Sequence, residues 1–175
     1  HPGGSTGAGY GAQFLRSIVA PALQDWGAII VSPDAPERGW DNDMGERAVL
    51  ALLEDVRGRA TIDPERILVT GFSMGGRGTW FMASRHPDLF TAAIPMAARS
   101  NSDDAAKDGE MPVFIIHARD DEVVPFGPAE ELATEMEARG QNVSFLPLDG
   151  VGHFRMGVTP LDEAGDWVIQ QWGAQ

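Results

Sequence analysis

The sequence Thr70-Gly71-Phe72-Ser73-Met74-Gly75-Gly76 has the spacing G-x-S-x-G. The apolar, β-branched residues 66–69 before it predict a buried parallel strand, and residues 77–85 after it contain helix formers and no proline. A serine at a strained strand-to-helix turn projects its hydroxyl clear of the sheet, and neighbouring side chains larger than hydrogen would collide there. The pattern by itself is weak, because glycine and serine are common in any tight turn. With its flanking strand and helix it predicts a nucleophile elbow at Ser73.

Length, charge and cysteine content limit the classes of protein that this sequence can encode. The 175 residues, 43% hydrophobic and 22% charged, are typical of one globular domain, which we predict over residues 1–175. A formal net charge of -13 disfavours nucleic acid and anionic membranes as partners. The absence of cysteine excludes disulfides, thiolate metal sites and a cysteine nucleophile. No apolar run reaches membrane-spanning length and no signal peptide is recognisable, which leaves a cytoplasmic or a secreted location open.

Apolar β-branched segments alternate with segments of helical periodicity along the chain. We predict strands over residues 28–31, 67–70, 92–95, 113–117 and 143–147, and helices over 10–24, 43–56, 77–85, 128–139 and 161–172. Pro21 should kink or shorten the first helix, and Asn42 or Asp43 should cap the second. This alternation indicates an α/β fold, with a mostly parallel sheet of about five strands and helices on both faces. In such sheets, sites form beyond the carboxyl ends of the strands.

A serine nucleophile requires a base, which is usually a histidine oriented by a carboxylate. His153 is the strongest candidate, because the glycines of residues 149–154 allow its loop to turn the imidazole inward. His86 lies at a predicted helix end and is interpreted as structural. His117 closes a strand, where its ring could hydrogen-bond nearby loop backbone. His1 is terminal.

Three motifs resemble those of a known superfamily. They are Gly71-Phe72-Ser73-Met74-Gly75-Gly76, His117-Ala118-Arg119-Asp120-Asp121-Glu122-Val123-Val124-Pro125 and Gly152-His153. Their order, serine, aspartate, histidine, is that of the α/β-hydrolases, and they look most like the small serine esterase branch. That branch includes phospholipase/carboxylesterase, dienelactone hydrolase-like and polyhydroxybutyrate depolymerase-like enzymes.

The resemblance also selects between two adjacent carboxylates. Position alone leaves Asp120 and Asp121 open as the acid, since only one of them can point at the histidine. In the small esterase branch a segment H-G-x-x-D-x-x-V-P places the acid at its D, which implies Asp121 here; Ala118 replaces the glycine of that segment. The resemblance therefore implies a catalytic triad of Ser73, Asp121 and His153.

The resemblance further implies two backbone donors for an oxyanion hole. The first is the N–H of the residue after the nucleophile, Met74. The second comes from a His-Gly type loop, which the opening His1-Pro2-Gly3-Gly4 resembles. Gly3 is the favoured donor and Gly4 is the alternative, because Pro2 has no N–H to donate.

The usual fold has strands before that loop, whereas this sequence begins at the loop itself. In the family the missing third strand lies between the counterparts of residues 28–31 and 67–70, so its absence would leave unpaired backbone. Three interpretations follow: a piece of a longer hydrolase, a sheet that has closed directly, or a strand borrowed from a partner. A minimal, rearranged α/β-hydrolase without a lid domain is the favoured one. An exposed sheet edge would favour a homodimer.

The predicted function is a serine carboxylesterase that hydrolyses small or short-acyl esters through an acyl-enzyme intermediate, with no metal or organic cofactor. The lack of an inserted lid predicts a shallow pocket for small, water-soluble esters. Aromatic residues could line that pocket or belong to the core; they are Trp40, Trp80, Phe126 and Phe154. Two alternatives stay open: a thioesterase, lactonase or peptidase with the same triad, and a catalytically silent binding module or inactive fragment. The acidic residues 41–43 favour a helix cap over a calcium site.

Overall fold

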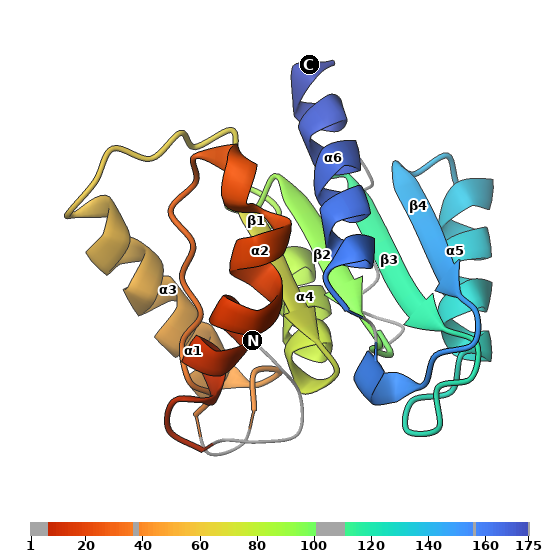
Figure 1. Ribbon diagram of the computed structural model, residues 1–175. Helices are drawn as coiled ribbons and strands as arrows, with labels where there is room; N and C mark the ends of the chain where they lie inside the picture. Colours follow the sequence, from red (N-terminus) through yellow and green to blue (C-terminus); the bar gives the residue numbers. More distant parts are fainter. Residues whose placement is uncertain (1–6, 37–38, 101–110, 156, 175) are drawn as a thin grey trace.

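Four parallel strands form the centre of the structure, a computed structural model that describes residues 7–36, 39–100, 111–155 and 157–174 (Figure 1). They are β1 (Leu68–Phe72), β2 (Ala92–Met96), β3 (Val113–Ala118) and β4 (Val143–Leu148), in the order β1-β2-β3-β4. Every neighbouring pair is parallel. All four carboxyl ends therefore lie at one edge of the sheet, and the predicted α/β class is confirmed.

The two central strands are buried at every position. Their sequences, Ala92-Ala93-Ile94-Pro95-Met96 and Val113-Phe114-Ile115-Ile116-His117-Ala118, show no polar alternation. A continuous apolar run is what a strand requires when both faces of its sheet are covered. Helices from the rest of the chain provide that cover on each side.

The N-terminal helical segment and the C-terminal helix cover one face (Figure 1). The N-terminal segment comprises α1 (Tyr10–Phe14), the π-helical η1 (Leu15–Val19), α2 (Ala20–Ala22) and the 3₁₀ turn η2 (Gln24–Trp26). Pro21 lies just after the π-helical residues and the helix ends at Ala22, which agrees with the predicted shortening. The C-terminal helix, α6 (Thr159–Gly173), buries its apolar side against the sheet; the fully buried positions are Leu161, Ala164 and Val168.

Three helices lie on the other side of the sheet. They are α3 (Asp43–Arg57), α4 (Met74–Arg85) and α5 (Gly127–Ala138). Trp80 of α4 and Met136 of α5 are buried against Ile115 of β3. Helix α3 packs on α4 and on Ile67, the residue before β1. Asn42 caps α3 as predicted, because its side-chain oxygen accepts the N–H groups of the first helical turn.

The prediction of a strand at residues 28–31 is wrong, so the described sheet has four strands rather than about five. The segment forms no ladder with β1, although its sequence is Ala28-Ile29-Ile30-Val31. The side chain of Ile29 is 56% exposed and that of Val31 is 44% exposed. An apolar β-branched run favours extended backbone, but it becomes a strand only beside a hydrogen-bonding partner about 4.8 Å away.

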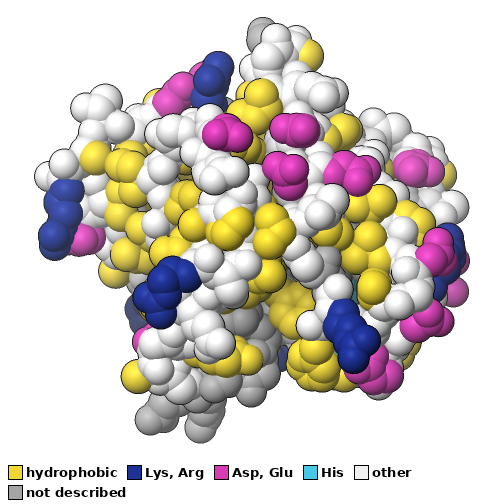
Figure 2. Space-filling view, in the orientation of Figure 1, with side chains coloured by type: hydrophobic (Ala, Val, Ile, Leu, Met, Phe, Trp, Pro, Cys, Tyr) yellow, Lys and Arg dark blue, Asp and Glu magenta, His cyan; other side chains and the backbone are white. Residues whose placement is uncertain are grey.

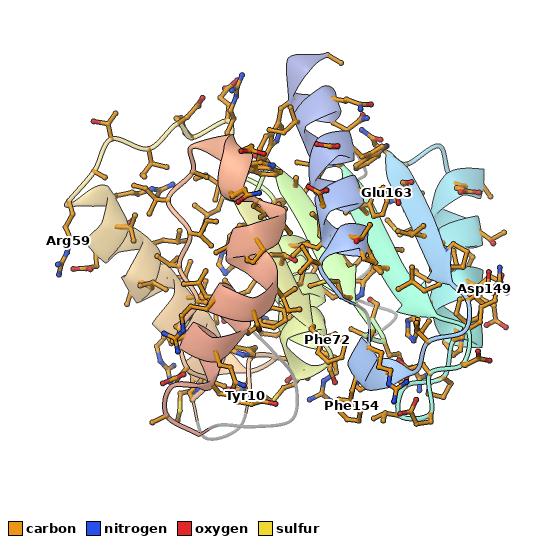
Figure 3. All side chains as sticks on the ribbon, in the orientation of Figure 1. Tyr10, Arg59, Phe72, Asp149, Phe154 and Glu163 are labelled. Atoms are coloured by element: carbon orange, nitrogen blue, oxygen red, sulfur yellow. The ribbon has the colours of Figure 1, made fainter. Side chains whose placement is uncertain are left out.

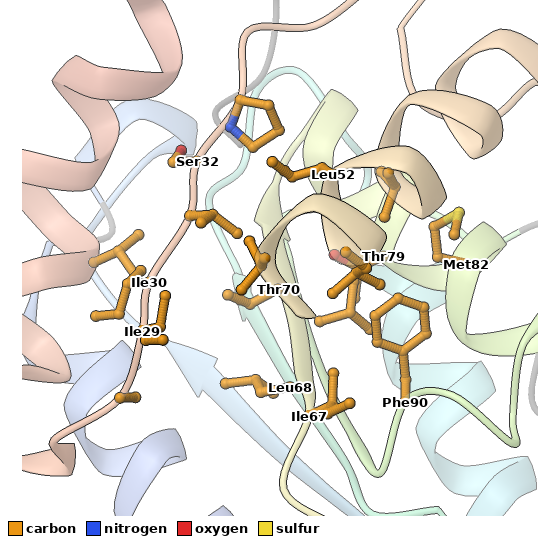
Figure 4. Close-up of a pocket in the computed structure, with 18 of the residues that line it drawn as sticks. Ile29, Ile30, Ser32, Leu52, Ile67, Leu68, Thr70, Thr79, Met82 and Phe90 are labelled. Carbon is orange, nitrogen blue, oxygen red and sulfur yellow. The ribbon is translucent and has the colours of Figure 1, made fainter. Parts of the chain in front are cut away.

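A cavity of about 240 Å³ separates residues 28–33 from β1 (Figure 4). Ile29, Ile30 and Ser32 line one wall, and Leu68 and Thr70 of β1 lie across from them. Over the described residues, the segment 28–33 therefore does not pair with β1, and the interpretation of a directly closed sheet is wrong. The two other interpretations, a piece of a longer hydrolase and a borrowed strand, stay predictions, as do the homodimer and the single domain over residues 1–175.

The outer side of α6 carries acidic side chains, which gather on the face shown in Figure 2. They are Asp162, Glu163 and Asp166, all exposed, so this charge is solvated. None of the described helices combines the length and the apolar character needed to cross a membrane.

Candidate active site

Ser73 lies at a sharp turn between the end of β1 and the start of α4. Its backbone has φ 54° and ψ -112°, a conformation that L-residues rarely adopt. The turn is held by the N–H of Ser73, which donates to the carbonyl oxygen of Met96 at 2.8 Å. A Cβ at Gly71 would lie 2.4 Å from the carbonyl oxygen of Gly75, so glycine is required for this close approach. The predicted strand-turn-helix context is confirmed.

The imidazole of His153 reaches Ser73 from the loop after β4. His153 begins a short 3₁₀ turn, η3 (His153–Arg155), and its Nε2 lies 3.0 Å from Ser73 Oγ. Its side chain is only 1% exposed. The sequence separation between the two residues is 80 positions, and the parallel sheet brings them together at its carboxyl edge.

Asp121 completes the group from the loop after β3. Its Oδ2 lies 2.7 Å from His153 Nδ1, and its Oδ1 accepts the N–H groups of Val123 at 2.9 Å and Val124 at 2.7 Å. Burial alone would raise the pKa of Asp121, but the hydrogen bonds from His153, Val124 and Val123 together hold that pKa below its ordinary value of 3.8. The neighbouring Asp120 is exposed, and none of the described residues bonds to its carboxylate.

These contacts define the tautomer of His153. An ionised carboxylate can only accept hydrogen bonds, so the proton on His153 is at Nδ1, facing Asp121. Nε2 is then an unprotonated acceptor for the hydroxyl of Ser73. The arrangement can remove a proton from the serine oxygen and hold the resulting imidazolium beside a negative charge.

One predicted oxyanion donor is described and the other is not. Met74 is the first residue of α4, and its N–H has no acceptor within the described residues. A helix N-terminus directs such free N–H groups toward negative charge. Gly3 and its alternative Gly4 lie outside the described residues.

His117, which was expected to bond to loop backbone, does so. Its Nε2 lies 3.0 Å from the carbonyl oxygen of Val124, so Nε2 carries the proton, and it is also 3.4 Å from Asp121 Oδ2. Burial lowers the pKa of His117, which outweighs the opposing effects of the Val124 carbonyl and the Asp121 charge. His117 is therefore a neutral hydrogen-bond donor that holds the loop containing Asp121 and Val124 in place.

Sequence reasoning missed Glu122. Its Oε2 accepts the backbone N–H of His153 at 2.9 Å. This residue directly follows the acid in the motif, which was the only available signal. Sequence gives no indication that its side chain reaches a loop 31 positions further along the chain.

Two phenylalanines, Phe72 and Phe154, flank the imidazole of His153, and Figure 3 shows both near the carboxyl ends of the strands. The ring centroid of Phe72 lies 4.8 Å from that of His153. The ring centroid of Phe154 lies 4.9 Å from that of His153, and these two rings meet edge to face. Phe154 is 77% exposed, whereas the predicted pocket candidates Trp40 and Trp80 are buried in the core. Phe126 packs against Phe145 and the guanidinium of Arg119.

Candidate metal ligands do not assemble over the described residues, where no group of three or more His, Asp or Glu side chains could hold an ion. His86, interpreted as structural, has its Nε2 2.8 Å from Glu46 Oε1, and that oxygen also accepts from Arg85.

With this geometry established, comparisons with known proteins give a consistent result. The model of the "Dienelactone hydrolase family" matches residues 33–156. This match includes the turn at Ser73, the acid loop and His153.

Individual proteins extend the comparison. The cutinase est1 of Thermobifida alba is 34% identical over an alignment of 157 residues, which covers 85% of this chain and 52% of that protein. The crystal structure of a thermostable esterase has a TM-score of 0.61 and 28% identity, covering 78% of this chain and 38% of its own. A truncated carbohydrate esterase from gut microbiota has a TM-score of 0.80 and 18% identity, covering 98% of this chain and 84% of its own. This likeness shows a shared fold. The chain thus spans about half the length, or less, of the curated relatives it matches.

Proposed function

Because the chain belongs to the dienelactone hydrolase family, we propose that it is a serine carboxylic ester hydrolase whose triad is Ser73, His153 and Asp121. The observation that carries the proposal is the continuous hydrogen-bonded row from Ser73 Oγ to His153 Nε2 and from His153 Nδ1 to Asp121 Oδ2, at 3.0 Å and 2.7 Å. Relatives named as an esterase and a cutinase give independent support.

In the first half of the reaction, Ser73 Oγ attacks the ester carbonyl carbon while its proton moves to His153 Nε2. The carbonyl oxygen becomes an oxyanion, which accepts a hydrogen bond from the free N–H of Met74 at the start of α4. We assign the second donor to Gly3. The tetrahedral intermediate then collapses: the bond to the alcohol oxygen breaks, and His153 gives its proton to that oxygen. An acyl group is left on Ser73.

In the second half, water replaces the alcohol. His153 removes a proton from the water, the hydroxide attacks the acyl carbon, and the proton returns to Ser73 Oγ as the carboxylic acid leaves. Asp121 holds the imidazole in one tautomer throughout and balances its positive charge; the lowered pKa of Asp121 keeps it ionised for this role. The residues require no metal or organic cofactor for any of these steps.

We assign small or short-acyl esters as the substrate class. Ser73 is half-buried, and the exposed ring of Phe154 lies beside the imidazole at the surface, so an ester can approach from solvent with an apolar group against that ring. A p-nitrophenyl ester series of increasing acyl length tests this assignment. Hydrolysis should be fastest for the short acyl chains, and a clear preference for long chains would contradict it.

The proposal itself is tested by covalent labelling with a fluorophosphonate, comparing the native protein with Ser73→Ala. Labelling and ester hydrolysis should both depend on Ser73. A folded native protein that is neither labelled nor active would favour a catalytically silent module. A parallel panel of ester, thioester, lactone and peptide substrates separates the esterase from other enzymes with the same triad, because the fold does not distinguish them.

A further inference from the structure

The side chain of Glu122 takes no part in the proton transfers proposed above, yet it contacts the residue that performs them. We propose that Glu122 is a positioning residue: its carboxylate holds the backbone of His153, so that the imidazole stays between Ser73 and Asp121. This inference rests on the proposed function, because positioning matters only if His153 is the base.

The geometry assigns different tasks to two adjacent carboxylates. Asp121 receives the ring Nδ1–H of His153 at 2.7 Å, which sets the orientation of the imidazole. Glu122 receives the backbone N–H of the same histidine at 2.9 Å, which sets the position of its main chain. Both carboxylates follow β3, whereas His153 follows β4. One short loop thus fixes both the ring and the backbone of the base.

The loop of His153 has few other attachments. Over residues 150–155, the hydrogen bond to Glu122 is the only one that joins the backbone to another segment of the described chain. The bond from the N–H of Arg155 to the carbonyl of Gly152, at 3.1 Å, is internal to the turn. Phe154 is 77% exposed and provides little packing. Over the described residues, the anchor at Glu122 is therefore the polar restraint on the backbone of this loop, whereas the bonds to Asp121 and Ser73 restrain the ring of His153.

Gly152 supports the same interpretation. Its backbone φ lies outside the left-handed region, so its conformation is open to other residues. A Cβ at this position would lie 2.5 Å from Glu122 Oε2 and 3.3 Å from its carboxyl carbon. A side chain at position 152 would therefore displace the flexible Glu122 carboxylate and would leave the turn itself unstrained.

Charge strengthens the contact. The backbone N–H of His153, followed by the N–H of Glu122 itself, holds the pKa of Glu122 below its ordinary value of 4.5, against the opposing effects of burial and then of the Asp121 charge. Glu122 is therefore an ionised acceptor at neutral pH, and hydrogen bonds to ionised acceptors are stronger than those between neutral groups.

The test begins with three variants. Glu122→Ala removes the acceptor, and kcat should fall about tenfold with KM changed less than about twofold, because loss of alignment affects the chemical step. Glu122→Gln keeps an acceptor oxygen and should restore kcat to within about threefold of the native value. Asp120→Ala is the matched control; it removes a carboxylate of the same loop that makes no contact with His153, so its kcat should be unchanged.

Gly152→Ala displaces the Glu122 carboxylate by an independent route. It should lower kcat to about the same extent as Glu122→Ala, and the double variant should be no worse than either single one, because both remove one contact. Gly127→Ala is its control, since a Cβ there meets nothing within 4 Å. Fully additive losses in the double variant would overturn the proposal.

A measurement without turnover separates this inference from the proposed function. In NMR spectra, the Nδ1–H proton of His153 that faces Asp121 should be resolved in the native protein, and it should broaden by exchange in Glu122→Ala and Gly152→Ala but not in Asp120→Ala. An unchanged resonance in Glu122→Ala, or an unchanged kcat in an active enzyme, refutes the positioning role. Absence of Ser73-dependent activity in the native protein would instead refute the proposed function, and the NMR comparison would still decide whether Glu122 holds His153.

Discussion

Gly76→Ala should impair both stability and catalysis, because Gly76 lies where α4 crosses the ends of β1 and β2. A Cβ at this position would lie 2.5 Å from the Cβ of Ala98 and 2.6 Å from the carbonyl oxygen of Met96. Ordinary contacts of a Cβ begin near 3.4 Å. The start of α4 must therefore move by about 1 Å, since Met96 is main chain and cannot rotate away.

The size of the effect follows from that displacement. Overpacking of this kind typically destabilises a protein by about 1–3 kcal/mol, which lowers Tm by about 2–4 °C per kcal/mol at this chain length. The same movement shifts Ser73 from its 3.0 Å contact with His153, and a misplacement of about 1 Å can lower kcat about hundredfold. Differential scanning calorimetry and ester hydrolysis measure the two effects.

Two further variants make the reasoning refutable. Gly127→Ala is the control, because its Cβ meets nothing, and it should keep the native Tm and kcat. Ala98→Gly combined with Gly76→Ala removes one of the two close contacts and should recover part of the loss, while the contact with Met96 remains. A Gly76→Ala protein with native Tm and native kcat would show that the elbow does not depend on this close approach.

Three other outcomes are expected. Asp121→Asn should lower kcat about 10⁴-fold in the ester assay with the fold retained, because an amide presents the wrong hydrogen-bonding pattern to His153 Nδ1. Since burial lowers the pKa of His117, the unfolded chain takes up a proton at a higher pH than the folded chain does. The free energy of unfolding should therefore be undiminished above pH 6.5 and should decrease as the pH falls from there through the lower pKa of the folded state. Urea titrations should show that His117→Asn removes this part of the pH dependence. Of the two inactive variants Ser73→Gly and Ser73→Ala, the glycine variant should unfold at the higher urea concentration. Glycine adopts φ 54° without the backbone strain of about 1–3 kcal/mol, and the relief of that strain exceeds the smaller entropic cost of glycine.

The parts of the fold that could be predicted are those with local requirements. The elbow was predicted because a strained turn between a strand and a helix admits few residue types, and Gly71 and Ser73 have the spacing it demands. The strands β2 and β3 were predicted because continuous apolar runs satisfy a sheet covered on both faces, and the half-buried strands β1 and β4 were predicted from similar apolar, β-branched segments. Ser73, His153 and the pair Asp120 and Asp121 were predicted to lie close together because the carboxyl ends of parallel strands meet at one edge, whereas the choice of Asp121 came from the resemblance to the small esterase branch.

Other parts of the fold depend on contacts with distant segments of the same chain, which the sequence does not specify. The apolar residues 28–31 have the composition of a strand, but a strand requires a neighbour at hydrogen-bonding distance, and a cavity lies there instead. Glu122 was missed for a related reason. Its side chain could extend into solvent or fold back on the next loop, and only the arrangement of β3 and β4 determines which loop it reaches.

The crowded elbow is also expected to link stability and reactivity in this molecule. Met96 O accepts the N–H of Ser73 and is also, with the Cβ of Ala98, one of the two atoms that exclude a side chain at Gly76. The next residue, Ala97, has a positive φ of 46° although it is not glycine. Two strained residues therefore lie at the ends of neighbouring strands: the N–H of Ser73 donates to Met96 O, and the N–H of Ala97 donates to the carbonyl oxygen of Ile116 at 2.9 Å. Because strained backbone persists only where surrounding contacts maintain it, packing changes on β2 should alter the position of Ser73 before they unfold the sheet.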